Sequence, residues 1–192
     1  MPFPDEPLGR RVEVVSYRAA WAGEGVLLAA QLAALLPGAV CVQHIGLTSV
    51  PGLAAKDCID LMVQVHDLDC ADVTAVLARH GYRRRPEPWN QQESSFGAVC
   101  RKQVFAPAPG SRPCNVHVRE HGGPNVRYAL LFRDYLTADH AAAAAWGRFK
   151  IRLAQSVTDL TDYGQIKAPA QEILIQSAER WAQDQHWRPQ PP

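Results

Sequence analysis

Two hydrophobic patterns divide this chain: strand-like patterns dominate the first two-thirds, and apolar residues recur at helical spacing over the last third. Alternation, or a short β-branched run bounded by glycine or proline, predicts a strand, and a three-and-four repeat predicts a helix. The strands we expect span residues 11–17, 39–45, 59–66, 82–85, 96–106 and 113–120. The helices we expect span 18–36 and 68–80, then two stripes from 124 onward, and finally 168–186. A polar, Pro-containing stretch, 86–95, is expected to be a loop.

Strands that precede helices along the chain are typical of an α+β fold, in which a mixed, partly antiparallel sheet carries packed helices. In a doubly wound parallel sheet, strands and helices would alternate along the chain. We therefore expect an α/β core over 1–122 and C-terminal helices over 123–187 that pack on or beside it. The last five residues, 188–192, are expected to be disordered.

Composition narrows the class of protein. With 192 residues, 47% hydrophobic and 20% charged, the chain is expected to be one soluble globular domain. A formal net charge of +1 gives no strong signal for nucleic acid or an anionic membrane. Five cysteines without a C-x-x-C pair indicate reduced thiols. With no signal peptide or membrane-length apolar run, we expect a cytoplasmic protein.

A turn of small residues, GLTSVPG, separates the second and third expected strands. Small residues let backbone N–H groups approach a phosphate closely, so Gly46, Thr48 and Ser49 are candidate ligands for an anion. Lys56, a few residues later, could neutralise the same phosphate. The alternative is an ordinary structural turn followed by a solvated lysine.

Asp60 opens the third expected strand, which is otherwise apolar. Burying a carboxylate there is costly without a cation or hydrogen-bond donors, so Asp60 is a candidate magnesium ligand and catalytic residue. Its alternatives are a helix cap or a partner for an arginine. Met62, two residues later on the same face, stands where a two-metal site would need a second carboxylate, and methionine cannot hold magnesium.

The strand 113–120 places His117 on one face with Asn115 and Arg119. If this strand neighbours the one that carries Asp60, His117 and Asp60 border one pocket, and His117 becomes a second catalytic candidate. With His44 they would form a two-histidine, one-carboxylate set that suits a transition metal. Histidines far apart in sequence are more often structural.

Two further basic residues are candidate anion ligands. Arg101, with its neighbour Lys102, could form a basic wall, although solvated charges that protect a sheet edge are equally expected. Lys167 lies in the polar stretch TDLTDYGQIK before the last expected helix, where it could reach a phosphate or hold a helix end. The chain contains no P-loop, dinucleotide fingerprint, nucleophile elbow or HExxH motif.

Five segments in this order resemble the GrpB-like family: HIGLTSVPGLAAK with the following ID, GYRRR, NVHV, LLFRDYL and DYGQIKAP. The resemblance covers nearly the whole chain and implies a nucleotidyltransferase-like fold; some dephospho-CoA kinases carry a similar domain at their C-terminus. Two positions depart from the nucleotidyltransferase pattern. Leu47 replaces the phosphate-binding Ser or Gly, and Met62 replaces the second carboxylate.

Three functions remain open at this stage. The one favoured is a degenerate or non-catalytic domain that binds a small anion, nucleotide-like or CoA-like. The alternative is an active nucleotidyltransferase that uses Mg²⁺ on Asp60 and a small acceptor, or an accessory domain related to coenzyme A biosynthesis. The third, an interaction protein that binds a partner through its helical C-terminal third, ranks last.

Overall fold

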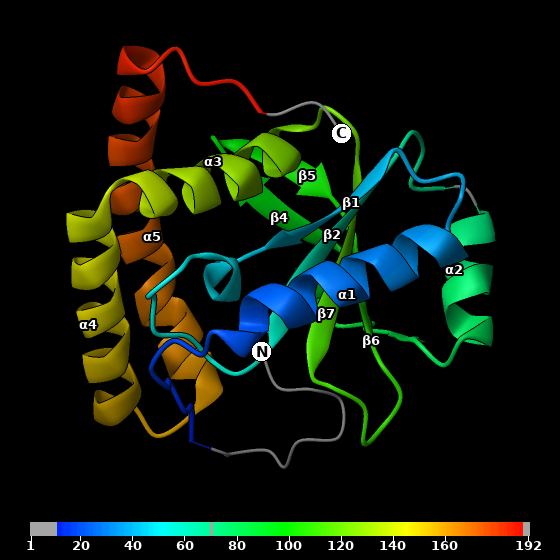
Figure 1. The fold of residues 1–192 in the computed structure, drawn as a ribbon, viewed down its shortest axis with the longest axis horizontal. Helices are drawn as coiled ribbons and strands as arrows, with labels where there is room; N and C mark the ends of the chain where they lie inside the picture. Colours follow the sequence, from blue (N-terminus) through cyan, green and yellow to red (C-terminus); the bar gives the residue numbers. More distant parts are fainter. Residues whose placement is uncertain (1–10, 70, 190–192) are drawn as a thin grey trace.

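The structure is a computed structural model that describes residues 11–69 and 71–189. Figure 1 shows a twisted sheet with helices on both faces and two long C-terminal helices along one side. The helices are α1 (Ala20–Leu35), α2 (Ala71–Arg79), α3 (Pro124–Ala138), α4 (His140–Ser156) and α5 (Leu160–Asp184), with short 3₁₀ turns at Leu47–Ser49 and Pro88–Asn90. The strands are β1 (Cys41–Ile45), β2 (Ile59–Val65), β3 (Arg83–Arg84), β4 (Gln92–Ser95), β5 (Ala98–Arg101), β6 (Gln103–Ala106) and β7 (Cys114–Glu120). The predicted α+β class is confirmed.

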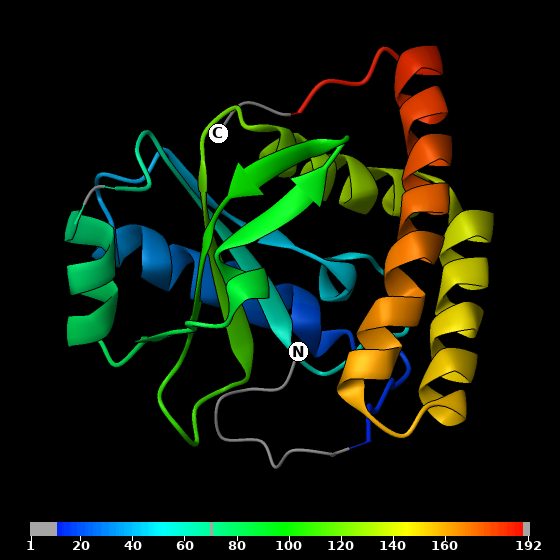
Figure 2. The ribbon, with the colours of Figure 1, turned by 180° about the vertical axis from the view of Figure 1, so that it is seen from behind.

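The main sheet has the order β1-β2-β7-β6-β3. Only the central pair, β2 and β7, is parallel among the described strand pairs of this sheet; the others are antiparallel. β4 and β5 form a separate hairpin, which lies on the side of the sheet opposite α1 (Figure 2). The predicted mixed, partly antiparallel sheet is therefore confirmed.

Strand alternation decides which side chains reach each face. On β2, Leu61 and Val63 pack with Trp21 and Leu32 of α1 in the largest apolar cluster. Met62 points the other way, into a smaller cluster beneath α3. Asp60 lies on that second face too, one pleat nearer the start of the strand, so the candidate site lies on the α3 side of the sheet.

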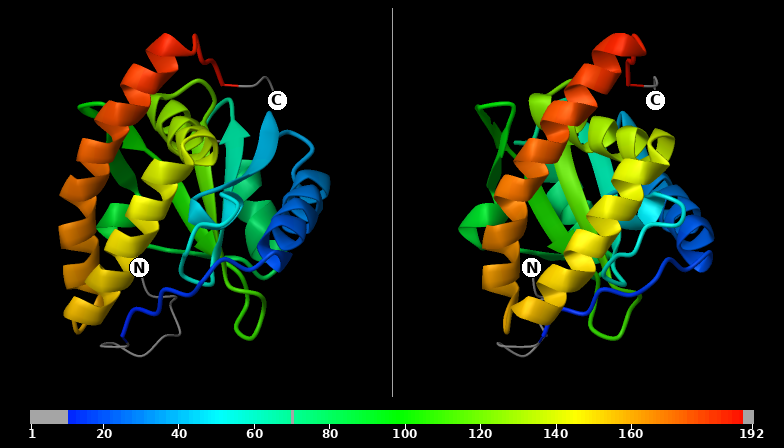
Figure 3. Two further views of the ribbon diagram at one scale, coloured as in Figure 1. Left: turned by 60° about the vertical axis from the view of Figure 1, so that its left-hand side comes forward. Right: turned by 90° about the vertical axis from the view of Figure 1, so that its left-hand side faces the viewer.

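The C-terminal helices share an apolar cluster with the loop that follows β1. Val50 and Leu53 pack against Leu131 of α3, Trp146 of α4 and Ile175 of α5. Figure 3 shows α4 and α5 side by side along the edge of the molecule. The helices thus pack against the sheet region as expected, while the division at 122 and 123 stays a prediction.

Four element predictions are wrong in detail. Only Val15 of the expected strand 11–17 pairs, with Ala55. The expected strand 96–106 is two strands, β5 and β6, in different sheets, because β5 pairs with β4. The expected loop 86–95 is not all loop, because it contains β4. The last helix begins at Leu160, since the side chain of Asp159 caps it by accepting from the backbone N–H groups of Thr161 and Asp162. In the expected tail, Arg188 and Pro189 form no regular element, and 190–192 lie outside the described residues.

Candidate functional site

Strand pairing brings Asp60, Asn115 and His117 together at the start of β2 and β7. Asp60 is directly opposite Asn115 in the parallel register, and His117 follows one pleat later. The side-chain amide of Asn115 donates to Oδ1 of Asp60 at 2.9 Å, and Nε2 of His117 lies 3.5 Å from the same oxygen. The predicted juxtaposition of Asp60 and His117 is therefore confirmed, although their catalytic roles stay predictions.

The surroundings of Asp60 keep it ionised. Burial acts to raise its pKa, but the hydrogen bonds and charge of His117, the amide of Asn115 and the charge of Lys56 together hold that pKa well below its ordinary value. Burial lowers the pKa of His117, while Asp60 acts to raise it. Its Nδ1 has no hydrogen-bond partner among the residues that the structure describes.

The turn after β1 is fitted closely to Asp60. Gly46 has φ of 71°, and a Cβ built there would lie 2.5 Å from Oδ2 of Asp60. The glycine is therefore required both by its backbone conformation and by the carboxylate beside it. Two predicted phosphate ligands have protein partners: the Ser49 hydroxyl donates to the carbonyl of Gly46, and Thr48 contacts Nε2 of His44 at 2.9 Å. Of these two, Thr48 lines the cavity described below.

The predicted metal set of His44, Asp60 and His117 is not assembled. His44 pairs with Leu61, so its side chain lies on the α1 face, where its ring packs against Gly25. Asp60 faces the other way. Among the described residues, no group of three His, Cys, Asp or Glu side chains could hold a metal ion.

Met62 is fully buried and cannot complete a magnesium site. Its side chain packs with Ile45, Val126 and Leu130, and its sulfur accepts from Nη1 of Arg119 at 3.3 Å. Asp60 is then the only hard anionic ligand that the site offers within the described chain, with Oδ1 already bonded to Asn115. These residues do not fit the paired carboxylates of a two-metal centre. Magnesium binding at Asp60 alone stays a prediction.

A cavity of about 230 Å³ opens beside Asp60, and most of the charged side chains in its described lining are cations. Lys56, Arg85, Lys150 and Lys167 all line it, and Asp60 is the one carboxylate among its described lining residues. The whole chain has only four lysines, so three of the four meet here. Lys56 and Lys167 form no ion pair with another described residue. We call this cavity the Asp60 pocket.

The lysines of the Asp60 pocket disfavour one another's charge. Burial, followed by the charges of Lys167 and Lys56, lowers the pKa of Lys150 to about 7. Burial and the charge of Lys56 also lower the pKa of Lys167. Lys150 is 1% exposed, and its Nζ donates to the carbonyl of Ala54 at 2.6 Å. The pocket therefore concentrates positive charge that its own residues do not neutralise.

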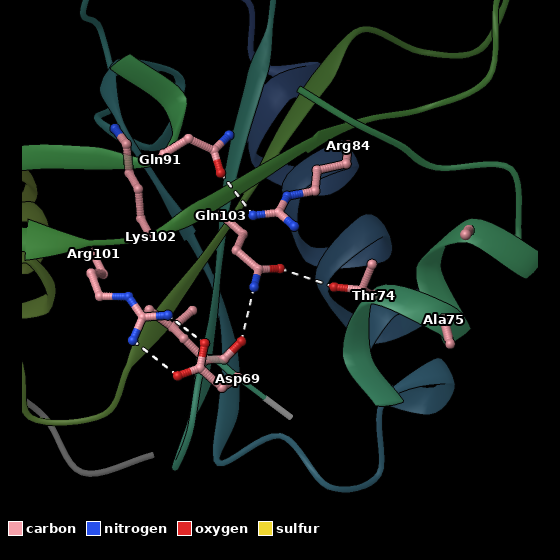
Figure 4. Close-up of a pocket in the computed structure, with 10 residues that line it drawn as sticks. Asp69, Thr74, Ala75, Arg84, Gln91, Arg101, Lys102 and Gln103 are labelled. Atoms are coloured by element: carbon pink, nitrogen blue, oxygen red, sulfur yellow. Dashed lines mark hydrogen bonds and ion pairs between the residues drawn. The ribbon is translucent and has the colours of Figure 1, made fainter. Parts of the chain in front are cut away.

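Arg101, a predicted anion ligand, lies elsewhere. It is exposed and forms a two-pronged ion pair with Asp69 beside a separate, open hollow of about 510 Å³ (Figure 4). In that hollow, Arg84 donates to Gln91, and Gln103 bridges Thr74 and the Leu68 carbonyl. Arg101 therefore does not line the Asp60 pocket, and its role as an anion ligand stays a prediction.

Two residues of these cavities and their surroundings, Lys150 and Glu93, were not predicted from the sequence. Lys150 lies on the same helical stripe as the buried Trp146 and Leu153, and a lysine at that spacing is the signal that could have found it. Glu93 lies in the segment expected to be a loop, yet its carboxylate accepts from Lys102 at 2.9 Å and Arg119 at 2.8 Å. Burial acts to raise the pKa of Glu93, and the charges of Arg119 and Lys102 hold it at about 2.

Comparison with solved structures places the fold. The chain superposes on a GrpB protein from Enterococcus faecalis with a TM-score of 0.71 and 28% identity, over 92% of this chain and 100% of that one. It also superposes on Cid1, solved in complex with its short product ApU, with a TM-score of 0.51 and 16% identity over 79% of this chain and 48% of Cid1. The second likeness shows the nucleotidyltransferase-like fold alone. No helix in the described part of the chain is long and apolar enough to span a membrane.

Sequence comparison identifies the family. The chain is 36% identical over 169 residues to a dephospho-CoA kinase of Mycobacterium tuberculosis, which is 79% of this chain but only 42% of that protein. It is 34% identical over 165 residues to a UPF0157 protein of Streptomyces coelicolor, covering 84% of this chain and 81% of the other. The family described as GrpB protein matches residues 11–176. The chain belongs to the GrpB family.

Proposed function

We propose that the Asp60 pocket binds a small phosphate-bearing anion, nucleotide-like or CoA-like, without two-metal nucleotidyl transfer. The observation that carries this proposal is the charge of the described lining: Lys56, Arg85, Lys150 and Lys167 against Asp60 alone. Arg85 pairs with Glu87, 3.5 Å away and outside this lining, so the three lysines against Asp60 leave a surplus of two positive charges when all are ionised. A phosphate group is the ligand that matches this surplus.

The same lining argues against a two-metal mechanism. A cation entering the pocket would meet those four positive side chains and a single carboxylate, whereas paired metals need at least two. Met62 is buried beneath α3 and offers only a thioether, so no local rearrangement of that side chain supplies the missing oxygen. Binding therefore relies on lysine and arginine charge, with Asp60 holding His117 and Asn115 in place.

Similarity to the dephospho-CoA kinases suggests one source for the anion. Those proteins are named for a substrate that carries phosphates and a nucleotide portion, and this chain matches 42% of their length. The shared region could hold a CoA-like ligand next to a catalytic region. This is a proposal about ligand chemistry, and it assigns no kinase activity to this chain.

Calorimetric titration with pyrophosphate and with ATP, each in EDTA and then in excess magnesium, tests the proposal. We expect both anions to bind in EDTA and to bind at least tenfold more weakly to Lys167→Met. Arg148→Met is the matched control, because it also removes one positive charge from an exposed site outside the pocket. Equal affinities for the two variants would contradict the proposal, as would binding that appears only with magnesium.

A further inference from the structure

A second cavity of about 670 Å³ adjoins the Asp60 pocket, between the β4–β5 hairpin, α3 and α5. We call it the hairpin cavity. Lys56, Tyr163 and Lys167 line both cavities. An anion held by these two lysines therefore has the hairpin cavity directly beside it, so the rest of the same ligand can enter there.

The hairpin cavity is not built for further phosphate. Beyond the two shared lysines, its described lining carries one positive side chain, Arg119, and two negative ones, Glu93 and Glu172, which gives a surplus of one negative charge. Arg119 already donates to Glu93 through two nitrogens, at 2.8 and 3.2 Å. Away from the two shared lysines, a further anionic group would therefore find no available cation and would meet two carboxylates.

The rest of the lining suits a flat ring with hydrogen-bonding edges. Phe96, Tyr128 and Tyr163 contribute aromatic surface, and Gln171 and Gln176 contribute side-chain amides that both donate and accept. Aromatic surface binds the faces of heterocycles, while amides read their edges. This combination differs sharply from the cationic lining of the Asp60 pocket.

Phe96 is held at the cavity by an unfavourable backbone. It occupies the two-residue loop between Ser95 and Ala98 with φ of 53°, followed by Gly97 at 79°. Such a loop favours asparagine or glycine at the first position, and a phenylalanine there is strained. The residue is 40% exposed, and its ring centre lies 5.3 Å from that of Tyr128, with the Arg127 guanidinium 5.0 Å above one face. A strained aromatic residue in the lining of a cavity points to a binding role.

We propose that the hairpin cavity binds the heterocyclic base of a nucleotide whose phosphates lie in the Asp60 pocket, with Phe96 and Tyr128 as the stacking surface. This inference rests on the proposed function, because it assigns the phosphates to the Asp60 pocket. It adds the chemical class of the remaining part of the ligand. It also assigns a specificity role to the β4–β5 hairpin, which bears no catalytic candidate.

The test compares pyrophosphate with ADP, GDP, CDP and UDP, using wild-type protein and Phe96→Asn. Asparagine suits the loop, so this variant removes the ring without disturbing the hairpin. We expect Phe96→Asn to bind at least one nucleoside diphosphate about tenfold more weakly and to bind pyrophosphate unchanged. Val99→Asn, on the same hairpin at a position 73% exposed and outside the cavity lining, should change neither affinity.

The outcomes separate the two proposals. Pyrophosphate binding that persists while all four nucleoside diphosphates are unaffected by Phe96→Asn overturns the base site and leaves the phosphate site standing. An equal loss for pyrophosphate and the diphosphates also overturns it, because the ring would then act on the phosphate end. Absence of pyrophosphate binding to the wild type overturns the proposed function and, with it, this inference.

Discussion

Replacing Lys150 by methionine should stabilise the folded protein at neutral pH while it weakens anion binding. The side chain is buried in α4, next to Lys56 and Lys167, and its charge is opposed by both burial and those neighbours. Methionine has a similar length and no charge. A lysine that lowers stability but raises ligand affinity would be retained for binding, which is what the account of the Asp60 pocket requires.

The magnitude follows from two opposing changes. The pKa of Lys150 is lowered from 10.5 to about 7, and at about 1.4 kcal/mol per pKa unit this difference subtracts about 5 kcal/mol from the free energy of unfolding once the group is protonated. Methionine removes that penalty but leaves the carbonyl of Ala54 without its donor, which costs about 1–3 kcal/mol. The net expectation is stabilisation of about 2–4 kcal/mol near pH 7.

The pH dependence has a definite sign. Because the pKa of Lys150 is lower in the folded state than in the unfolded state, its effect on wild-type stability is absent above pH 10.5 and grows unfavourable as the pH falls toward about 7. Below about pH 7 the penalty is constant. The advantage of Lys150→Met should therefore be greatest near neutrality and should vanish or reverse near pH 10.

Urea denaturation at about pH 6.5, 8 and 9.5 measures the effect. Arg152→Met is the control, since it removes one positive charge from an exposed position on the same helix and should change stability by less than about 0.5 kcal/mol. Lys150→Met that is less stable than wild type at neutral pH, or equally stabilised at all three pH values, would refute the reasoning. The main role of Lys150 would then be to stabilise the fold through its hydrogen bond to the carbonyl of Ala54.

Three further predictions concern the same site. Gly46→Ala should destabilise the fold by about 2 kcal/mol more than Gly52→Ala, because both glycines have positive φ but only the first has Asp60 within 2.5 Å of the new Cβ; equal costs in chemical denaturation would contradict the contact. Pyrophosphate binding at about pH 8 should take up a fraction of a proton through Lys150, seen as a binding enthalpy that differs between buffers of different ionisation enthalpy; the difference should disappear in Lys150→Met, and its persistence there would assign the proton to another group. Arg101→Ala should leave pyrophosphate affinity unchanged in calorimetry, because Arg101 pairs with Asp69 away from the Asp60 pocket. A marked loss of pyrophosphate affinity would show that Arg101 contributes to the binding site.

The sequence was sufficient to predict that Asp60 lies beside His117, for a physical reason. Asp60 interrupts an apolar strand, and strand alternation puts His117 on the polar face of strand 113–120. The one assumption needed to bring them together is that these two strands are neighbours. The same alternation, applied to β1, separates His44 from them. That step needed the register, in which Ile45 and not His44 pairs with Asp60. The register between strands cannot be derived from the local residue pattern of either strand.

Lys56 and Lys167 were predicted as anion ligands, but their meeting with Lys150 in one cavity was not, because the three lysines come from distant elements. Lys56 follows the turn, Lys150 lies in α4 and Lys167 in α5, so only the packing of the C-terminal helices against the loop that carries Leu53 brings them together. The start of α5 was missed because the stretch TDLTDYGQIK is polar. The cap from Asp159 and the burial of Tyr163 nevertheless begin the helix there.

The central claim is that the Asp60 pocket binds phosphate through protein cations and not through magnesium on Asp60. Pyrophosphate affinity of Asp60→Asn, measured by calorimetry in EDTA against the wild type, tests it most directly. Asparagine keeps the shape and removes a negative charge from the pocket, so we predict binding to both proteins and tighter binding to the variant. Binding that requires magnesium in the wild type and is abolished by Asp60→Asn would contradict the claim and support a metal-dependent nucleotidyltransferase instead.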